Sequence, residues 1–294
     1  MNYYFLPGAG IYGGIKVAFQ FVELLHALGV EAVVATPDGS APSWFPTPVP
    51  VVAERDALAR LDAGDHLVFS YPFDYERWRA TPARLVFHCQ GTNPVIDPIL
   101  ADPDVAVLTG WRQATDYARN RGRADAVEVG IAISDVFFEP TEAERAPRVA
   151  YMPRKGGAIA DACRRVVGHV EWRAIDGATE PEVAVALQAS EVYLATAVNE
   201  GFGLPALEAM ACGCVVVSVP VVGGTEYLHD GWNCVVAEPD QLPTELARVL
   251  GDDHAVQRAE MRVHARDAAE RYRWSRVRDH LHELLEGDLR FLTD

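Results

Sequence analysis

The chain has 294 residues, of which 49% are hydrophobic and 23% are charged, and its formal net charge is -16. These proportions are typical of a globular protein and exclude a disordered or fibrous one. An acidic surface repels phosphate backbones, so we expect neither nucleic acid nor an anionic membrane as the main partner. At roughly 100–200 residues per domain, the length predicts two domains.

No run reaches the roughly 20 apolar residues that a membrane span needs. The start, from Met1 to Gly8, lacks the basic region and long apolar run of a signal peptide. The five cysteines lie in apolar surroundings, and Cys212 and Cys214 have the wrong spacing for a zinc knuckle. We therefore expect buried thiols, no metal site and a cytoplasmic location.

Apolar runs alternate with helical patterns along the whole chain. A strand at 3–6 is followed by a glycine-rich turn, Gly8 to Gly14, and by a helix that Gly29 ends. Further strands are expected at 31–35, 67–69, 84–88, 105–108 and 126–129, with helices at 54–61 and 112–121. A proline-rich and charged stretch at 137–147 is the expected linker. Beyond it we expect strands at 148–152, 170–175, 192–195, 214–219 and 233–236, helices at 158–167, 182–189 and 205–211, and a helical tail at 242–292. This alternation predicts α/β units on largely parallel sheets.

The most informative stretch runs from Asn199 to Val217 and reads NEGFGLPALEAMACGCVVV. It has the pattern of a turn, a short helix and a strand. Pro205 suits the first helical position, so the turn before it leaves backbone N–H groups at a helix N-terminus, where phosphate binds readily. Gly201 and Gly203 let the backbone approach a ligand closely.

Two carboxylates flank this phosphate site. Glu208 lies about one turn into the helix and Glu200 on the loop that faces it. Carboxylates suit the vicinal hydroxyls of a ribose or a hexose, while amides and cations suit phosphates. A capped helix with an exposed acid is the alternative interpretation of the same residues.

Glu200 and Glu208, separated by seven residues in the setting E-G-F-G-L-P-x-L-E-A-M-A-x-G, resemble the signature of family-4 retaining glycosyltransferases. In that family the first acid meets the donor sugar, the loop amides meet the sugar and diphosphate, and the second acid binds the ribose hydroxyls. The resemblance implies that these amides belong to Gly201, Phe202, Gly203 and Leu204. It also implies the GT-B fold, with two Rossmann-like domains whose parallel sheets face a cleft.

Other segments resemble the family in the same order. Arg154 and Lys155 follow a strand where the family places an arginine and a lysine against the diphosphate. The family spacing of these cations is longer, which leaves open which of the two contributes more, and a solvated basic pair is the alternative. Gly13 and Gly14 belong to the family's first loop, which touches the diphosphate. His88, at the end of a strand, occupies a place near sugar and acceptor, with a structural histidine as the alternative.

Three weaker likenesses complete the pattern. Segment 129–133 resembles an Asn-Gly-Ile-Asp motif without its Asn and Asp, and segment 223–227 resembles a turn that contacts base or sugar, although a surface turn fits equally. Segment 272–275 resembles the start of a last helix that returns to the first domain. The expected domains are therefore 1–143 with the helix 274–294, on the acceptor side, and 148–273, on the donor side. The interval between Lys155 and Glu200 is one strand–helix unit shorter than the family pattern.

These features predict a retaining glycosyltransferase that moves a sugar from a nucleotide-diphosphate sugar, of the UDP or GDP type, to a hydroxyl acceptor. The resemblance implies a front-face mechanism without metal or another cofactor. A nucleotide-sugar-binding protein without turnover is the alternative from another class. A GT-B epimerase, a phosphorylase and a nicotinamide dehydrogenase fit less well. The donor sugar, the base, the acceptor and the oligomeric state stay open.

Overall fold

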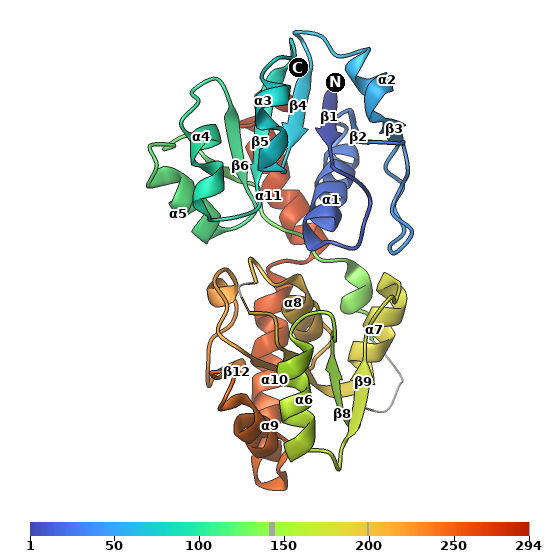
Figure 1. Cartoon of the computed structure of the whole chain (residues 1–294), viewed down its shortest axis with the longest axis vertical. Helices are drawn as coiled ribbons and strands as arrows, with labels where there is room; N and C mark the ends of the chain where they lie inside the picture. Colours follow the sequence, from blue (N-terminus) through green and yellow to red (C-terminus); the bar gives the residue numbers. More distant parts are fainter. Residues whose placement is uncertain (141–144, 199, 294) are drawn as a thin grey trace. The chain divides into compact units, whose positions relative to one another are not determined.

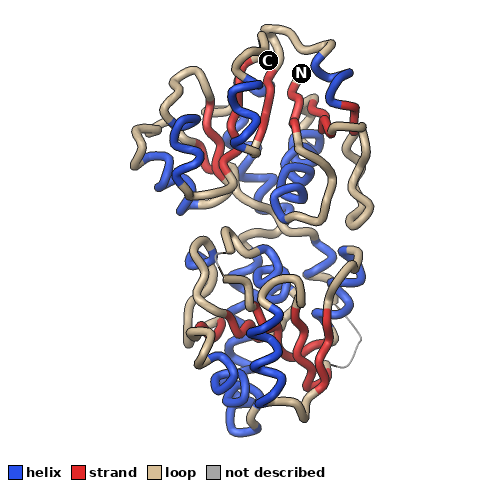
Figure 2. Tube along the Cα trace, viewed as in Figure 1, coloured by secondary structure: helices blue, strands red, loops and turns tan. Residues whose placement is uncertain are grey.

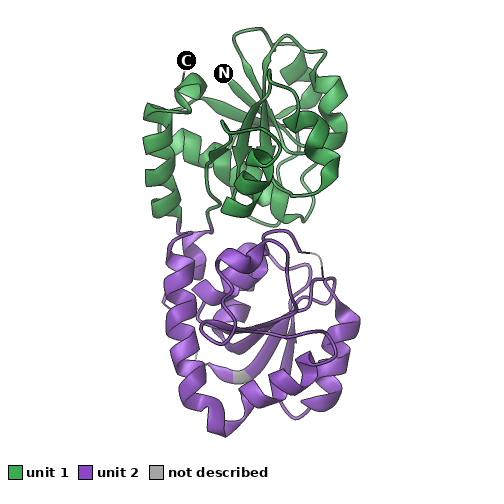
Figure 3. Ribbon diagram, turned by 90° about the vertical axis from the view of Figure 1, so that its left-hand side faces the viewer, with its two compact units in different colours: residues 1–132, 274–294 green, residues 133–273 purple. Residues whose placement is uncertain are grey.

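The computed structural model describes residues 1–140, 145–198 and 200–293. The chain forms two compact units: unit 1 holds residues 1–132 and 274–294, and unit 2 holds residues 133–273 (Figure 3). The sequence analysis placed the first boundary about ten residues later, within the segment 141–144, which lies outside the described residues. The segment that begins at Ile133 belongs to unit 2 because it is bonded there. The Ser134 hydroxyl donates to the Glu180 carboxylate at 2.6 Å, and the Gln188 amide donates to the Val136 carbonyl at 3.3 Å.

Unit 1 is built on a parallel sheet, which in the described residues has seven strands in the order β3-β2-β1-β4-β5-β6-β7. The strands are β1 (Asn2–Phe5), β2 (Ala32–Thr36), β3 (Val51–Ala53), β4 (His66–Phe69), β5 (Arg84–Cys89), β6 (Ala106–Thr109) and β7 (Val127–Glu128). Most of these strands are short apolar runs, as expected for a parallel sheet that is covered on both faces. The expected strand at 126–129 is only two residues long, and β3 is an edge strand that the sequence analysis did not predict.

Helices connect and cover this sheet (Figures 1 and 2). They are α1 (Gly13–Ala27), α2 (Glu54–Leu58), α3 (Tyr75–Trp78), α4 (Asp97–Leu100), α5 (Arg112–Arg119) and α11 (Trp274–Glu286). The last helix is far from α1 in sequence but shares its core, because Val277, Leu281 and Leu285 of α11 are buried in the same cluster as the apolar residues of α1. The C-terminal segment 274–294 is thus part of unit 1.

Unit 2 carries a second parallel sheet, of five strands as far as it is described, in the order β12-β11-β10-β8-β9. Its strands are β8 (Ala146–Tyr151), β9 (Glu171–Ala174), β10 (Ser190–Ala195), β11 (Val215–Ser218) and β12 (Cys234–Val236). Its helices are α6 (Gly157–Val166), α7 (Glu180–Gln188), α8 (Leu204–Ala211), α9 (Leu242–Leu250) and α10 (Ala255–Glu270). The prediction of an α/β fold with two parallel sheets is confirmed. None of the described helices is long and apolar enough to cross a bilayer.

The strand orders define one switch point in each sheet. In unit 1 the chain winds from β1 toward β3 on one side and from β4 toward β7 on the other, so the sheet reverses between β1 and β4. In unit 2 the reversal falls between β8 and β10. Connections to either side leave an opening at the carboxyl ends of such a strand pair, and open α/β sheets bind their ligands there.

Candidate functional site

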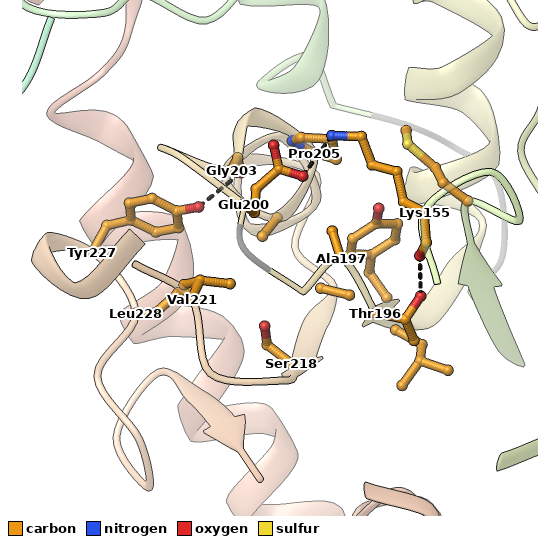
Figure 4. Close-up of a pocket in the computed structure, with 15 residues that line it drawn as sticks. Lys155, Thr196, Ala197, Glu200, Gly203, Pro205, Ser218, Val221, Tyr227 and Leu228 are labelled. Atoms are coloured by element: carbon orange, nitrogen blue, oxygen red, sulfur yellow. Dashed lines mark hydrogen bonds and ion pairs between the residues drawn. The ribbon is translucent and has the colours of Figure 1, made fainter. Parts of the chain in front are cut away.

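A pocket lies at the switch point of unit 2 (Figure 4). It is formed by the loops that follow β8 and β10 and by the ends of these strands and of β11. The lining residues used below are Lys155, Tyr193, Thr196, Glu200, Gly203 and Tyr227. Of the residues predicted from sequence, Lys155, Glu200 and Gly203 therefore line one pocket, although they come from two separate loops. Asn199, which begins the predicted motif, lies outside the described residues.

An ion pair crosses the mouth of this pocket. The Lys155 ammonium and the Glu200 carboxylate are 2.5 Å apart, and their side chains are 33% and 23% exposed. Figure 4 shows the two side chains meeting, with Tyr227 and Leu228 on the other side of the pocket. A half-buried cation held by a carboxylate has a fixed position yet stays open to a ligand. The site thus presents one positive and one negative group at the same opening.

The backbone after β8 is arranged to direct Lys155 into the pocket. The Lys155 amide donates to the Met152 carbonyl at 3.1 Å, and the Thr196 hydroxyl donates to the Lys155 carbonyl. Gly156 follows with φ +84°, and a Cβ there would lie 2.1 Å from the Thr196 carbonyl oxygen. The loop therefore packs directly on the end of β10, which only a glycine permits. Arg154, by contrast, is exposed and does not line the pocket.

The turn before α8 is held in place by the Tyr227 hydroxyl. Gly203 has φ +88°, and a Cβ there would lie 2.8 Å from the Tyr227 hydroxyl. That hydroxyl lies 3.0 Å from the Phe202 carbonyl and 2.7 Å from the Gly203 carbonyl, to which it donates. With the carbonyls turned toward Tyr227, the amides of Gly203 and Leu204 have no acceptor in the described part of the chain. These amides, at the N-terminus of α8, form a site suited to an anion.

Phe202 supports this turn instead of facing a ligand. Its ring is buried and packs against Tyr227 and Tyr272, with centroids 5.3 and 5.5 Å away. Only its backbone can serve the role that the family resemblance implies. Gly201 is exposed on the same turn. Gly223, in the segment expected to contact base or sugar, packs under the turn, since a Cβ there would lie 2.0 Å from the Gly201 carbonyl oxygen.

Glu208 lies on α8 and is 6% exposed, so it is the more enclosed of the two predicted acids. Its charge acts on Tyr193, which lines the pocket. Burial raises the pKa of the Tyr193 phenol, and the nearby charges of Glu208 and then Glu200 raise it further. Tyr193 therefore stays protonated and can donate a hydrogen bond toward either carboxylate or toward a ligand.

The residues predicted in unit 1 lie at the carboxyl ends of β1 and β5. Gly13 and Gly14 begin α1, and a Cβ on Gly14 would lie 2.5 Å from the Gln90 side-chain oxygen. His88 is fully buried within β5, with its Nδ1 2.9 Å from the Tyr4 hydroxyl. Burial lowers the pKa of His88 to about 3, so the ring is neutral at pH 7. The Gln90 amide in turn donates to the Tyr4 hydroxyl at 3.2 Å, which joins the three residues in one network.

The remaining candidates have structural surroundings. Gly130, in the Val129–Ile133 segment, has φ +81° and packs against Val277 of α11. All five cysteines lie in the described ranges, where they are free and buried. Among the residues that the structure describes, no group of three His, Cys, Asp or Glu side chains is arranged to hold a metal ion.

Sequence reasoning did not single out Tyr193 or Thr196, although both line the pocket. The available signal was position: Tyr193 and Thr196 lie at the carboxyl end of β10, beside the point where the strand order of unit 2 reverses. That position becomes evident only when the order of the strands is known.

Known proteins resemble this chain in sequence. Residues 155–252 match the model of the family described as Glycosyl transferases group 1. The chain is 28% identical over 263 residues to a D-inositol 3-phosphate glycosyltransferase of Stackebrandtia nassauensis, a match that covers 87% of this chain and 49% of that protein. A protein of the same name from Corynebacterium urealyticum is 34% identical over 108 residues, which are 35% of this chain and 25% of that one. The chain thus spans half or less of the length of these relatives.

Two solved structures are similar over nearly the whole chain. Anabaena Alr3699/HepE, in complex with UDP and glucose, superposes with a TM-score of 0.74 at 13% identity, covering 97% of this chain and 99% of that one. Sucrose-phosphate synthase from Thermosynechococcus elongatus gives a TM-score of 0.72 at 16% identity, covering 97% and 98%. At these identities the likeness establishes the fold. The chain therefore has the GT-B fold, and residues 155–252 resemble the family described as Glycosyl transferases group 1.

Proposed function

We propose that this chain transfers a sugar from a nucleotide-diphosphate sugar to a hydroxyl group of an acceptor, with unit 2 binding the donor and unit 1 the acceptor. One observation carries the proposal: Lys155, Glu200 and the N-terminus of α8 meet in a single pocket at the switch point of unit 2. A sugar diphosphate needs cations and N–H donors for its phosphates and carboxylates for its hydroxyls, and this pocket offers both. The UDP bound by Alr3699/HepE favours a uridine donor, with GDP as the other candidate.

In this proposal the diphosphate binds to Lys155 and to the amides of Gly203 and Leu204. The Lys155 ammonium has three donors, so it can contact a phosphate oxygen while it keeps one hydrogen bond to Glu200. Arg154 is exposed beside the pocket and adds a second, more mobile positive charge. The geometry thus favours Lys155 as the more important of the two cations.

The two acids are assigned to the hydroxyls. Glu200 lines the pocket and accepts hydrogen bonds from the donor sugar. Glu208 is more deeply placed on α8 and accepts from the ribose. Removing Glu208 is therefore expected to weaken binding of every nucleotide, whereas the direct contact of Glu200 with the donor forms only when a sugar is attached.

The proposed chemistry is a front-face displacement with retention. The bond from the anomeric carbon to the β-phosphate oxygen breaks, and a bond from that carbon to the acceptor oxygen forms on the same face. The acceptor proton passes to the departing phosphate. Lys155 and the α8 amides stabilise the negative charge that develops on that phosphate, which is the work that a metal ion does in other enzymes, so we propose metal-independent transfer.

Unit 1 contributes at its own switch point. The α1 N-terminus at Gly13 and Gly14 is proposed to contact the diphosphate. His88 is fully buried, so in this proposal it acts as a positioning residue, through Tyr4 and Gln90. The five buried, unpaired thiols favour a reducing compartment, and we propose a cytoplasmic location.

A panel of nucleoside diphosphates and nucleotide sugars, measured by thermal shift, tests the donor site. A ligand at about 100 times its dissociation constant stabilises the protein by roughly 2.7 kcal/mol. We expect one nucleotide family to raise the melting temperature, and Glu208→Ala to abolish the shift. Glu260→Ala, an exposed acid on α10, serves as the control and should leave it unchanged. A folded protein that responds to no nucleotide would contradict the donor-site assignment.

The same donor separates the two candidate functions. A glycosyltransferase releases nucleoside diphosphate on transfer or slow hydrolysis, and the anomeric configuration of the product is read by NMR. A nucleotide-sugar-binding protein would show affinity with no release of nucleotide. An inverted product would retain the donor site but contradict the front-face mechanism.

A further inference from the structure

A carboxylate lies beside both of the groups in unit 2 that are proposed to bind the phosphates of the donor. The Glu200 carboxylate is 2.5 Å from the Lys155 ammonium, and both side chains line the pocket (Figure 4). The Glu200 Cγ also lies 3.5 Å from the position that a Cβ on Gly203 would take, so the same side chain packs on the turn before α8. A phosphate bound to Lys155 and to the α8 amides would therefore lie next to Glu200.

The charges of this pocket balance each other. Among the described residues that line it, Lys155 is the one cation and Glu200 the one acid. Arg154 is exposed outside the lining, and Glu208 adds a second negative charge nearby, which acts on Tyr193. An additional negative charge on a ligand is attracted by Lys155 but repelled by Glu200. The pocket therefore gains little from a ligand with an extra phosphate charge.

The donor and the product of sugar transfer differ by such a charge. In a nucleotide-diphosphate sugar each phosphate carries one negative charge, whereas the terminal phosphate of the free diphosphate loses a second proton at about pH 6. The sugar hydroxyls of the donor can donate hydrogen bonds to Glu200, but a fully ionised phosphate has only acceptor oxygens. Glu200 thus has hydrogen-bond partners in the donor and a like charge in the product.

We propose that Glu200 is a specificity-determining residue that favours the sugar-bearing donor over the free nucleoside diphosphate and so promotes release of that product. The inference rests on the proposed function. During transfer the bond from the anomeric carbon to the β-phosphate oxygen breaks, and that phosphate takes up the acceptor proton. When the proton then passes to solvent, the terminal phosphate has gained one negative charge beside Glu200. The sugar that donated hydrogen bonds to Glu200 now belongs to the acceptor.

Two ligands that differ by one charge and carry no sugar test this role. They are UDP and its β-methyl phosphate ester, or GDP and the corresponding ester if the nucleotide panel identifies guanosine. Calorimetric titration at pH 8 gives their dissociation constants for the unsubstituted chain and for Glu200→Gln. We expect the substitution to tighten the free diphosphate about fivefold or more relative to the ester, because it removes one like charge at nearly constant side-chain shape.

Two further variants make the measurement specific. Glu208→Gln applies the same substitution to the other acid of the motif, which is proposed to accept from the ribose. Because the free diphosphate and the ester share that ribose, both should weaken by the same factor, and the ratio of their dissociation constants should stay unchanged. Glu200→Asp keeps the negative charge and should retain the ratio of the unsubstituted chain.

Release of the product is measured directly by stopped-flow displacement of the free diphosphate. We expect its dissociation rate to be about fivefold slower in Glu200→Gln, since differences in affinity between related complexes lie mostly in the dissociation rate. An unchanged or faster rate would overturn the proposal. So would equal changes of the free diphosphate and the ester, because Glu200 would then serve only to hold Lys155 in place.

Failure of the proposed function gives a different result. A folded, unsubstituted chain that binds neither UDP nor GDP would contradict the donor site itself, and the role of Glu200 with it. Nucleotide binding with the same ratio of dissociation constants in Glu200→Gln and in the unsubstituted chain would leave the donor site intact. It would contradict only the preference for donor over product.

Discussion

Lys155→Met is expected to lower the kcat of sugar transfer by about 10²–10³-fold, the usual effect of removing one group that stabilises developing charge. Lys155 is held at the pocket by Glu200, 2.5 Å away, and by a loop that packs on β10. Its charge is therefore preorganised for the departing phosphate. Steady-state kinetics with the donor found in the nucleotide panel measure the effect.

Two control variants make this prediction specific. Arg154→Met removes the adjacent cation, which is exposed outside the pocket, and should cost less than Lys155→Met. Arg165→Met removes an exposed cation at the end of α6 and should leave kcat unchanged. If Arg154→Met lowers kcat more than Lys155→Met does, the assignment of the principal cation is wrong.

Gly156→Ala is expected to destabilise unit 2 by about 3 kcal/mol, through backbone strain together with a steric clash. The added Cβ would lie 2.1 Å from the Thr196 carbonyl oxygen, and the backbone has φ +84°. To relieve that contact the loop must move away from β10 and take Lys155 with it. Nucleotide affinity should therefore fall together with stability.

Gly177→Ala supplies the matched control, because Gly177 also has a positive φ, +61°, but nothing lies within 4 Å of its Cβ position. It should cost only the backbone penalty, roughly 1–2 kcal/mol. Hydrogen exchange of the β8 and β10 amides measures these losses within unit 2. Equal losses in the two variants would show that the packing of Gly156 on β10 has no energetic importance.

Most of the fold could be predicted from the sequence because strands and helices alternate with clear periodicity. The missed elements are short: β3 has three residues, and α3 and α4 have four each. Segments of this length have too few residues to show a period. The units divide after Ala132, before the expected linker at 137–147. The reason is that hydrogen bonds of Ser134 and Gln188 attach the segment after Ala132 to unit 2.

The candidate site could be predicted in part. The motif around Glu200 and Gly203 could be recognised, because a proline in the first helical turn and the glycines before it form a local sequence pattern. The contact of Lys155 with Glu200 was not, because 45 residues separate them and only the strand order brings them together. The place of His88 at a strand end was visible in the sequence, but its complete burial depends on packing from other elements.

The central claim is that the pocket of unit 2 binds the diphosphate of the donor, and calorimetric titration of UDP against uridine, and of GDP against guanosine, tests it most directly. The difference within each pair isolates the phosphates from the base. We expect the diphosphate of one pair to bind more tightly than its nucleoside, and Lys155→Met to reduce that difference by about 1.5–3 kcal/mol, the value of a charged hydrogen bond. A difference that is the same in Lys155→Met as in the unsubstituted chain would contradict the account.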